Sequence, residues 1–426
     1  MKSSMSKVLH KIACEPMITH VIRTARSLGS NDIHIVASPS NRQEIEQVSE
    51  GCNILIQEEP LGTGHAVRSA SDVIAKATGT VLILYGDGPL YTSKTLLTFL
   101  KTFENNTEET IGVGLGFLGM QPQDPTGYGR MKTDENGYVT QIIEQKDASE
   151  TEQKIGLCWT GVMCAKAEKL NSWLAQITND NAQKEYYLTD LPAIAGKENA
   201  YTMHALCPVD ETLGANNRAE LAQLEKKMQE KLRAKAMENG ATLIDPNTVY
   251  LCEDTVIGKD VIIEPNVFFG PNVTIGDNCH IKAFSHLEGA TLKNGVVIGP
   301  FARMRPGAVL EDNVKIGNFV EVKNATFGEG AKANHLSYVG DAEVGEKSNI
   351  GAGTITCNYD GKNKHKTTIG KGAFVGSNAT LIAPITLEDG AYIGAGSTLS
   401  KNVPADSLAV ARSRAIIKDG WAKNRK

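Results

Sequence analysis

The chain has 426 residues and a formal net charge of −5, with 22% charged and 41% hydrophobic residues. This length allows roughly two or three domains, and the acidic balance excludes the basic face that nucleic-acid binding requires. No run of about eighteen apolar residues and no signal-peptide pattern is present, so the sequence predicts a cytoplasmic protein without a membrane partner.

The first half of the chain reads as alternating strands and helices. Apolar runs at 33–37 and 81–85 predict buried parallel strands, and the patterns at 40–49 and 64–76 predict helices. We therefore expect a Rossmann-like α/β domain over residues 1–215, with ligands at the carboxyl ends of its strands.

Three stretches of this domain carry polar or glycine-rich motifs. In Q-E-E-P-L-G-T-G-H-A, Gly62, Thr63 and Gly64 form a loop into a helix, which suits an anion but is equally typical of a plain turn. In Y-G-D-G-P-L, Asp87 ends a strand, where a carboxylate either caps a turn or holds a hard cation. The third stretch, D-P-T-G-Y-G-R at 124–130, is a glycine-rich turn.

A different composition begins at Asn216. Residues 216–240 are rich in helix formers, contain charge pairs four residues apart and end in Asn-Gly, a helix stop signal. We interpret residues 216–247 as a linker helix between two domains.

Aliphatic side chains then recur with a period of six residues. Between 369 and 399 the repeat has no exception, and the same spacing occurs over 257–287, 292–322 and 344–350. A helix would show spacings of three and four, and a strand would show two. The period of six predicts a left-handed parallel β-helix over about 248–404, in which each flat face of a triangular coil points one aliphatic side chain inward. A polar, basic tail follows the β-helix, and we assign the two together to one domain, residues 248–426.

A few polar residues stand out in this repeat. Arg305, Lys323, His335 and Tyr338 recur on successive coils, and we expect their side chains to stack along one outer edge. This arrangement would supply cations for a sugar phosphate beside a base, although an isolated histidine is by default an ordinary surface residue.

Taken together and in this order, the motifs resemble the bacterial family of bifunctional N-acetylglucosamine-1-phosphate uridylyltransferases/glucosamine-1-phosphate N-acetyltransferases. The resemblance covers essentially the whole chain. It implies two reactions of UDP-N-acetylglucosamine biosynthesis: acetyl transfer from acetyl-CoA to glucosamine-1-phosphate, and uridylyl transfer from UTP to N-acetylglucosamine-1-phosphate.

The resemblance assigns residues of the first domain to the UTP and UDP-sugar site. It also implies that Asp87 and Asn216 hold Mg²⁺. The full set is Lys7, Gln57, Gly62, Thr63, Tyr85, Gly86, Asp87, Gly129, Glu144 and Asn216. These residue types suit phosphoryl-group chemistry, because several negative charges must be brought together by a lysine, a metal ion and careful positioning.

The resemblance assigns His335 as the general base that removes a proton from the amine of glucosamine-1-phosphate. An imidazole suits this role because its ordinary pKa, about 6.5, lies near working pH. Glu321 would orient the histidine or the amine. The implied substrate-binding residues are Arg305, Glu321, Lys323, Tyr338, Asn349, Asn358 and Tyr359, and the implied acetyl-CoA contacts are Ala352, Ser377, Ala395 and Arg412.

Two departures from the family bear on uridylyl transfer. The family begins with a strand and a glycine-rich loop of the type L-A-A-G-x-G-T-R-M, whereas this chain starts at the methionine that would close that motif. Trp159 stands where the family has a small asparagine beside the sugar. Either Met1 is internal to a longer protein or this activity is impaired, and we expect acetyl transfer to be retained.

Two other functions fit parts of the sequence. One is a sugar-phosphate nucleotidyltransferase with a purely structural β-helix, and the other is a non-catalytic scaffold. Because one edge of a prism is too shallow to enclose a substrate, the resemblance implies a homotrimer with C3 symmetry whose neighbouring prisms and tails complete each site.

Overall fold

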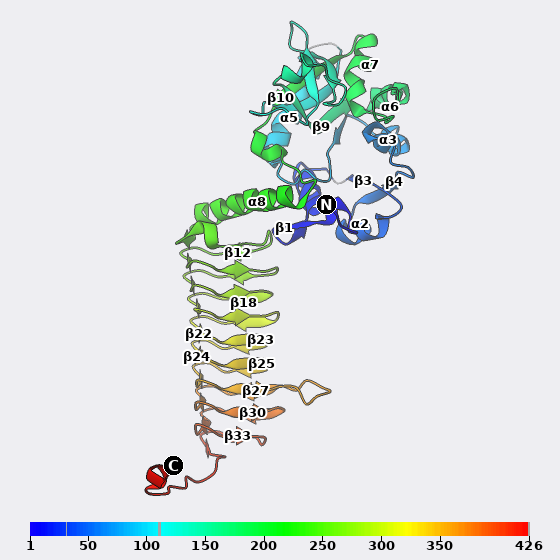
Figure 1. The fold of residues 1–426 in the computed structure, drawn as a ribbon. Coiled ribbons are helices and arrows are strands. Elements are labelled where there is room, and N and C mark those ends of the chain that lie inside the picture. Colours follow the sequence, from blue (N-terminus) through cyan, green and yellow to red (C-terminus); the bar gives the residue numbers. More distant parts are fainter. Residues whose placement is uncertain (31, 110–111, 425–426) are drawn as a thin grey trace. The chain divides into compact units, whose positions relative to one another are not determined.

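The computed structural model describes residues 1–30, 32–109 and 112–424 (Figure 1). The chain forms two compact units, Met1–Met228 and Gln229–Lys426. The boundary between them falls inside the long helix α8 (Arg218–Glu238).

The first unit is an α/β domain. Its helices are α1 (Met17–Ser27), α2 (Arg42–Val48), α3 (Thr63–Arg68), α4 (Ser71–Ile74), α5 (Ser93–Glu109), α6 (Ala167–Gln176) and α7 (Leu191–Lys197). Its strands are β1 (Lys11–Ile12), β2 (Glu15–Pro16), β3 (His34–Ala37), β4 (Asn53–Ile56), β5 (Thr80–Ile83), β6 (Val113–Met120), β7 (Arg130–Thr133), β8 (Val139–Ile143), β9 (Cys158–Lys166) and β10 (Tyr201–Leu206).

The main sheet of this unit has the order β10-β6-β9-β7-β8, with β5 paired to β9. Alternate residues of β6 point to opposite faces of the sheet and pack into two different hydrophobic cores. Phe117 packs with Leu170 and Leu191 of the α6 and α7 side, and Leu118 packs with Phe99 of α5. Helices therefore cover both faces of the sheet, as the α/β pattern predicted.

Strands β3 and β4 form a separate parallel sheet. Strand β3 pairs in parallel as predicted, although three of its four residues are only half-buried. The prediction for residues 81–85 was wrong, because β5 runs antiparallel to β9 and its four residues are only half-buried. Among the described residues, β3 and β5 each have one paired edge. A strand with one open edge keeps part of its apolar surface exposed, which explains the incomplete burial of β5.

The second unit is a left-handed parallel β-helix with three flat faces. Face 1 is the sheet β11 (Thr242–Leu243), β13 (Ile262–Ile263), β16 (His280–Ile281), β19 (Val297–Ile298), β22 (Lys315–Asn318), β24 (Lys332–His335), β26 (Asn349–Ile350), β29 (Phe374–Val375), β32 (Tyr392–Ile393) and β34 (Leu408–Ala409). Face 2 contains β14 (Phe268–Phe269), β17 (His286–Leu287), β20 (Arg303–Met304), β27 (Ile355–Cys357), β30 (Thr380–Ile382) and β33 (Thr398–Leu399). Face 3 contains β12 (Val256–Ile257), β15 (Thr274–Ile275), β18 (Ala290–Leu292), β21 (Ala308–Leu310), β28 (Thr367–Ile369) and β31 (Ile385–Leu387). Strands β23 (Glu321–Phe327) and β25 (Tyr338–Val344) continue from face 2 onto face 3, turning at Asn324 and Asp341.

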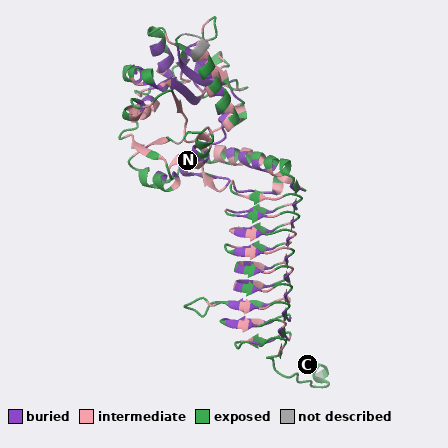
Figure 2. Cartoon of the chain, turned by 180° about the vertical axis from the view of Figure 1, so that it is seen from behind, coloured by how far each residue is buried: buried purple, intermediate pink, exposed green. Residues whose placement is uncertain are grey.

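The interior of the prism follows the predicted period. Ile263, Phe269 and Ile275 line successive faces of one coil and are at most 1% exposed. Figure 2 shows this alternation of buried and exposed positions along every coil. The period continues through Phe327, Ala333 and Val339, also at most 1% exposed, which the sequence pattern had not assigned. Each face also buries the residue two positions earlier, such as Val267, which is 1% exposed and which the period of six had not assigned. Stacking of coils therefore builds the core, because no coil can bury its inward side chains alone.

Each corner of the prism turns through a residue with positive φ. Two of the corners use asparagine, aspartate, glycine and one lysine, as at Asn278 and Asn313. The corner between faces 1 and 2 differs, because its middle coils carry Phe284, Phe301, Phe319 and Leu336 with φ between 49° and 60°. Bulky side chains in this left-handed region cost about 1–2 kcal/mol each relative to their preferred backbone conformation.

Candidate functional site

The first candidate site lies at the end of β5. The ammonium group of Lys7, in a short 3-10 helix (Lys7–Leu9), lies 2.5 Å from the Asp87 carboxylate. The same group donates to the side-chain oxygen of Asn216 at 3.0 Å. Carboxylate and carboxamide oxygens thus converge on one cation, and these are the donors that Mg²⁺ prefers. The described residues contain no cluster of three or more His, Cys, Asp or Glu side chains with metal-binding geometry.

A glycine turn approaches this region from α3. Gly62 has φ +107°, and a Cβ on it would lie 2.7 Å from the Tyr186 carbonyl oxygen, so only glycine fits. Gln57 donates to the Gly62 carbonyl at 3.2 Å and to His65 at 3.1 Å. The turn is therefore held in one conformation by its own hydrogen bonds.

Thr63 and Tyr85 connect this turn to the core. The Thr63 hydroxyl accepts a hydrogen bond from the Leu188 amide at 3.1 Å. Burial raises the pKa of Tyr85 well above its ordinary value, a hydrogen bond with Thr63 opposes that shift, and the charges of Glu144 and Asp87 add to it. The phenol is neutral and lies within electrostatic reach of both carboxylates.

Glu144 lies beside Gly129, because a Cβ added to Gly129 would be 3.7 Å from a carboxylate oxygen of Glu144. Burial raises the pKa of Glu144, and the negative charges of Asp147, Asp190 and Glu185 raise it further. A hydrogen bond with Thr189 partly opposes this increase. Sequence reasoning missed Thr189, which is 2% exposed. A Cβ on Gly86 would lie 3.3 Å from the Val8 side chain. All ten predicted residues of this site thus belong to the first unit, around the end of β5 and the neighbouring loops.

The sequence places Trp159 where the family has an asparagine beside the sugar, and in the structure this side chain is buried. Its indole is 7% exposed, packs edge-on against Tyr85 and Phe117, and donates to the Val162 carbonyl at 3.0 Å. The bulky ring is accommodated in the core, where its one polar atom is satisfied.

The second candidate site begins with one column at the end of face 1. Asn318 is paired with His335 across adjacent coils. The column then continues through Ala352, Ser377 and Ala395, each two positions after an inward residue of face 1. The expected base and three expected acetyl-CoA contacts therefore share one line on the surface.

Asn318 sets the tautomer of His335. The imidazole Nδ1 lies 2.7 Å from the Asn318 side-chain oxygen, and because an amide oxygen only accepts, Nδ1 carries the hydrogen. Nε2 is then the nitrogen without a hydrogen, and it can accept a proton from a group bound at the exposed side of the ring. Sequence reasoning missed Asn318, although its separation of 17 residues from His335 equals one coil.

Below His335 the column consists of small side chains on closely stacked coils. A Cβ on Gly351 would lie 2.6 Å from the Ser377 nitrogen, and one on Gly376 would lie 2.6 Å from the Ala395 nitrogen. Arg412 donates to the carbonyl oxygen of Ala395. These residues form a smooth strip with a guanidinium group at its lower end.

The expected phosphate-binding residues lie on face 2. Arg305 donates to Glu321 at 2.7 Å, and this contact raises the pKa of the guanidinium. A hydrogen bond and charge repulsion with Lys364 lower the pKa of Lys323, and Arg305 adds to this effect. Three cations therefore gather here. Lys364 was not predicted, because it lies in the irregular loop after β27.

Polar groups around Tyr338 complete this cluster. Asn358 donates to the Tyr338 hydroxyl at 3.4 Å and also to Asp341. Burial alone would raise the pKa of Asp341, but hydrogen bonds from Asn324 and Asn358 and the nearby ammonium groups of Lys364 and Lys323 lower it. The Tyr359 hydroxyl donates to Gly361 at 2.6 Å within the loop, and Asn349 is half-buried on face 1.

Two expectations about this site need correction. Arg305, Lys323, Tyr338 and His335 do not form one column, because 12 residues from Lys323 to His335 correspond to two faces rather than a full coil. Glu321 pairs with Arg305, and the side-chain partner of His335 is Asn318, so Glu321 does not orient the histidine. Its other expected role, orienting the amine, stays a prediction. The imidazole and the cations thus lie on adjacent faces of the prism, with the corner residues Phe319 and Leu336 between faces 1 and 2.

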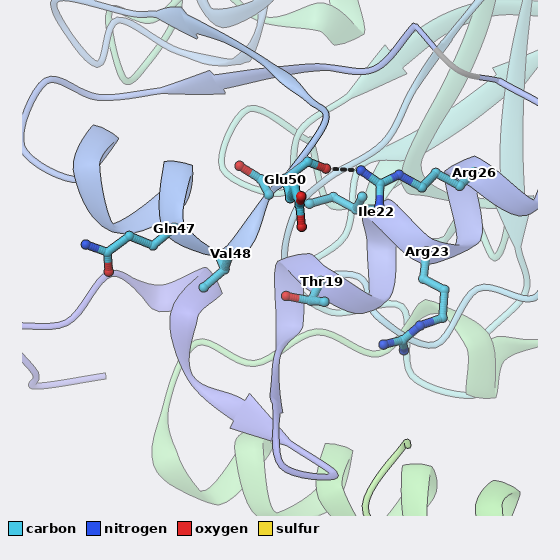
Figure 3. Close-up of a pocket in the computed structure, with 8 residues that line it drawn as sticks. Thr19, Ile22, Arg23, Arg26, Gln47, Val48 and Glu50 are labelled. Atoms are coloured by element: carbon cyan, nitrogen blue, oxygen red, sulfur yellow. Dashed lines mark hydrogen bonds between the residues drawn. The ribbon is translucent and has the colours of Figure 1, made fainter. Parts of the chain in front are cut away.

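Two cavities lie away from these residues. The one in Figure 3 measures about 280 Å³, lies between α1 and α2, and is lined by Thr19, Ile22, Arg23, Arg26, Gln47, Val48, Ser49 and Glu50. Its two guanidinium groups are engaged, Arg26 with the Glu50 carbonyl oxygen and Arg23 with Glu15. The other, about 380 Å³, lies on face 3 around Thr368, Thr386 and Asp389. Neither contains a predicted site residue.

Comparison with known proteins gives a consistent result for both units. Residues 2–183 match the nucleotidyl transferase family, and residues 254–289, 289–324 and 366–401 match bacterial transferase hexapeptide repeats. The chain is 45% identical to the bifunctional protein GlmU of Zymomonas mobilis, over 99% of this chain and 94% of that protein. It is 47% identical to GlmU of Azorhizobium caulinodans and 46% to that of Paramagnetospirillum magneticum, each over 99% of this chain and 93% of the relative.

Proposed function

The chain belongs to the bifunctional GlmU family, and on this premise we propose which of its residues carry the two transfers of UDP-N-acetylglucosamine biosynthesis. The protein is a transferase with acetyltransferase and nucleotidyltransferase activities. Its substrates are acetyl-CoA and nucleotides, and no helix among the described residues is long and apolar enough to cross a membrane. We expect it in the cytoplasm, where these co-substrates are made.

His335 is the proposed general base of acetyl transfer. The observation that carries this assignment is the hydrogen bond that Nδ1 of His335 donates to the Asn318 side-chain oxygen, which leaves Nε2 ready to accept a proton. As the amine of glucosamine-1-phosphate forms a bond to the thioester carbon, Nε2 takes the amine proton, and the carbon–sulfur bond breaks to release the thiol. Arg305, Lys323 and Lys364 would bind the phosphate, while Ala352, Ser377, Ala395 and Arg412 would bind acetyl-CoA.

Lys7, Asp87 and Asn216 form the proposed phosphate end of the uridylyltransferase site. Mg²⁺, held by Asp87 and Asn216, would neutralise charge on the phosphates of UTP. Lys7 would then contact phosphate oxygens. Gln57, Gly62, Thr63, Tyr85, Gly86, Gly129 and Glu144 would position the uridine and the sugar. The oxygen donors around the Lys7 ammonium support this assignment.

Assembly into a C3 homotrimer is also part of the proposal. Hexapeptide repeats support it, and so does the exposed position of His335, for which one prism provides only one side of a site. A scaffold without activity would not need the ordered His335–Asn318 pair or the three gathered cations.

Two assays on the same preparation test these assignments. Thiol release from acetyl-CoA with glucosamine-1-phosphate should fall about 100-fold or more in His335→Ala, because a general base typically contributes that much. Pyrophosphate release from UTP and N-acetylglucosamine-1-phosphate should depend on added Mg²⁺ and be lost in Asp87→Ala.

Each variant serves as the control for the other, since His335 and Asp87 lie in different units. His335→Ala should retain pyrophosphate release, and Asp87→Ala should retain thiol release. Full thiol release by His335→Ala would rule out this base. Pyrophosphate release that survives both Asp87→Ala and a chelator would rule out the metal assignment.

A further inference from the structure

The loop that carries Lys364 projects from the β-helix between β27 and β28 (Figure 1). It spans residues 358–366, contains no aliphatic residue, and is exposed from 359 to 364. The hexapeptide repeats resume only at residue 366. Apolar burial in the prism core therefore does not fix the position of Lys364.

Charge repulsion acts against the observed position of Lys364. This residue lowers the pKa of Lys323 through a hydrogen bond and through charge repulsion. The Asp341 carboxylate attracts both ammonium groups and offsets part of the repulsion. A loop that could move would relieve the rest by taking Lys364 away from Lys323, so its observed path requires a further restraint.

Backbone contacts shape the loop into a short hairpin. Tyr359 and Lys364 form an antiparallel bridge. The His365 amide donates to the Asn358 carbonyl oxygen at 2.8 Å. Because a hairpin of two strands is at best marginally stable by itself in water, these backbone bonds alone would let it open.

A contact between two side chains closes this hairpin. Nε2 of His365 lies 2.7 Å from the Asp360 carboxylate. Hydrogen bonds from the Asn363 amide and the His365 ring hold the pKa of Asp360 well below its ordinary value. The carboxylate is thus ionised and only accepts, so Nε2 carries the hydrogen. We call the contact between Asp360 and His365 the loop clasp.

The carboxylate of the loop clasp is held in place before the imidazole reaches it. Its other oxygen accepts from the backbone amides of Lys362 and Asn363 at 2.8 and 2.6 Å. An isolated surface ion pair contributes little, partly because two flexible side chains must be ordered. Here only the His365 side chain has to be ordered. The clasp therefore ties the residue next to Lys364 to the tip of the hairpin.

We propose that the loop clasp positions Lys364 for the phosphate of glucosamine-1-phosphate. His365 and Asp360 are then positioning residues of acetyl transfer. Successive side chains along a strand point to opposite sides, so His365 acts through the loop and not on the substrate. This inference rests on the phosphate site proposed above and adds the residues that hold one of its three cations in place.

His365→Ala tests the clasp, because it removes the imidazole but leaves the bonds between Asp360 and the turn amides. KM for glucosamine-1-phosphate should rise about 10-fold, since the loss of one hydrogen bond to a charged group costs about this much. The loss concerns binding, so kcat and KM for acetyl-CoA should stay close to wild type. An unchanged KM for the sugar phosphate would overturn the proposal.

His365→Gln is the conservative rescue. The amide nitrogen of glutamine can take the place of Nε2 and donate the same hydrogen bond to Asp360. KM for the sugar phosphate should return most of the way to the wild-type value. A KM as high as that of His365→Ala would show that the bond to Asp360 is not what matters, and would overturn the proposal.

Lys364→Gln shows whether the clasp acts through this lysine. Alone it should raise KM for the sugar phosphate about 10-fold, and adding His365→Ala should raise KM no further. The same fold increase from His365→Ala in both backgrounds would overturn the proposal. If Lys364→Gln raises KM and His365→Ala does not, the clasp fails while the phosphate site stands. If Lys364→Gln leaves KM unchanged, the assignment of Lys364 to the phosphate site itself fails.

His280 provides the matched control, because it forms a similar contact elsewhere on the same prism. Its Nε2 lies 2.8 Å from the Glu264 carboxylate, and the side-chain exposures of 35% and 27% compare with 32% and 45% in the clasp. This pair belongs to coils well before β27 in the stack. His280→Ala should keep the wild-type KM, and an increase as large as that of His365→Ala would overturn the proposal.

Limited digestion with trypsin measures the loop without an assay of activity. Lys362 lies exposed at the tip, and proteases cut exposed loops that open easily. Cleavage after Lys362 should be faster in His365→Ala than in wild type or His280→Ala, and slow again in His365→Gln. Equal cleavage rates in all four proteins would show that the clasp does not hold the loop, and would overturn the proposal.

Discussion

The hydrogen bond between Asn318 and His335 determines which imidazole nitrogen is free. In Asn318→Ala we expect kcat for thiol release to fall about 10- to 100-fold, a range typical for the loss of a group that orients a functional histidine. KM for the sugar phosphate should change little, because Arg305 and Lys323 lie on another face. Steady-state kinetics over a pH series would measure both quantities.

Asn318→Asp is the conservative control for this prediction. Its carboxylate still accepts from Nδ1 and so keeps the imidazole in the same orientation and tautomer. Activity should therefore partly return. If Asn318→Ala changed KM alone, Asn318 would have no role in orienting the base.

Lys364 keeps the pKa of Lys323 below its ordinary value. A lysine with a lowered pKa is charged below that pKa and loses its charge as pH rises through it. As the pH is raised, KM for glucosamine-1-phosphate should therefore begin to increase at a lower pH than it would if Lys323 had an ordinary pKa. In Lys364→Gln the repulsion is removed, so this increase should move to higher pH, while KM at neutral pH rises because one cation is lost. A pH series of KM tests this, and an alkaline limb at the same pH in both proteins would contradict it.

At the scale of the β-helix coil, glycine permits adjacent coils to approach. A Cβ on Gly317 would overlap the backbone of Asn334 on the next coil, and backbone cannot move aside without breaking the ladder of hydrogen bonds. We expect Gly317→Ala to destabilise the second unit by about 2–4 kcal/mol and to displace Asn318 from His335. Thermal unfolding and thiol release would measure the two effects.

Gly196→Ala is the matched control. Gly196 lies in α7, and its added Cβ would meet no atom within 4 Å. Because alanine favours a helix, this variant should be neutral or more stable by up to about 1 kcal/mol. Equal stability of Gly317→Ala and wild type would show that the coils have more room than the structure indicates.

At the scale of the whole molecule, each unit has its own core. The first packs helices on a sheet around Phe117 and Phe99, and the second packs the inward residues of its stacked coils around Ile298 and Met304. We expect at least two calorimetric transitions, because domains with separate cores need not unfold together. Gly317→Ala should lower the midpoint temperature of the β-helix transition only. A single transition for the whole chain, shifted as a whole by this substitution, would contradict the expectation.

The sequence alone was sufficient for the β-helix and for the family. A period of six repeats the same inward position on every face, so the inward residues from Ile263 to Val322 and from Ile369 to Ile393 could be assigned to the interior before any coordinates. The α/β pattern of the first unit could also be predicted, because it depends on local sequence. The direction of β5 could not, because it depends on pairing with the distant β9. Motifs such as Y-G-D-G also marked the phosphate end of the first site.

Only the tertiary structure decided the contacts that connect these motifs. The partner of His335 is Asn318 rather than Glu321, and Lys364 approaches Lys323 from an irregular loop. Such contacts depend on how coils of 17 or 18 residues stack and on the path of a loop without periodicity, and neither leaves a signal in the local sequence.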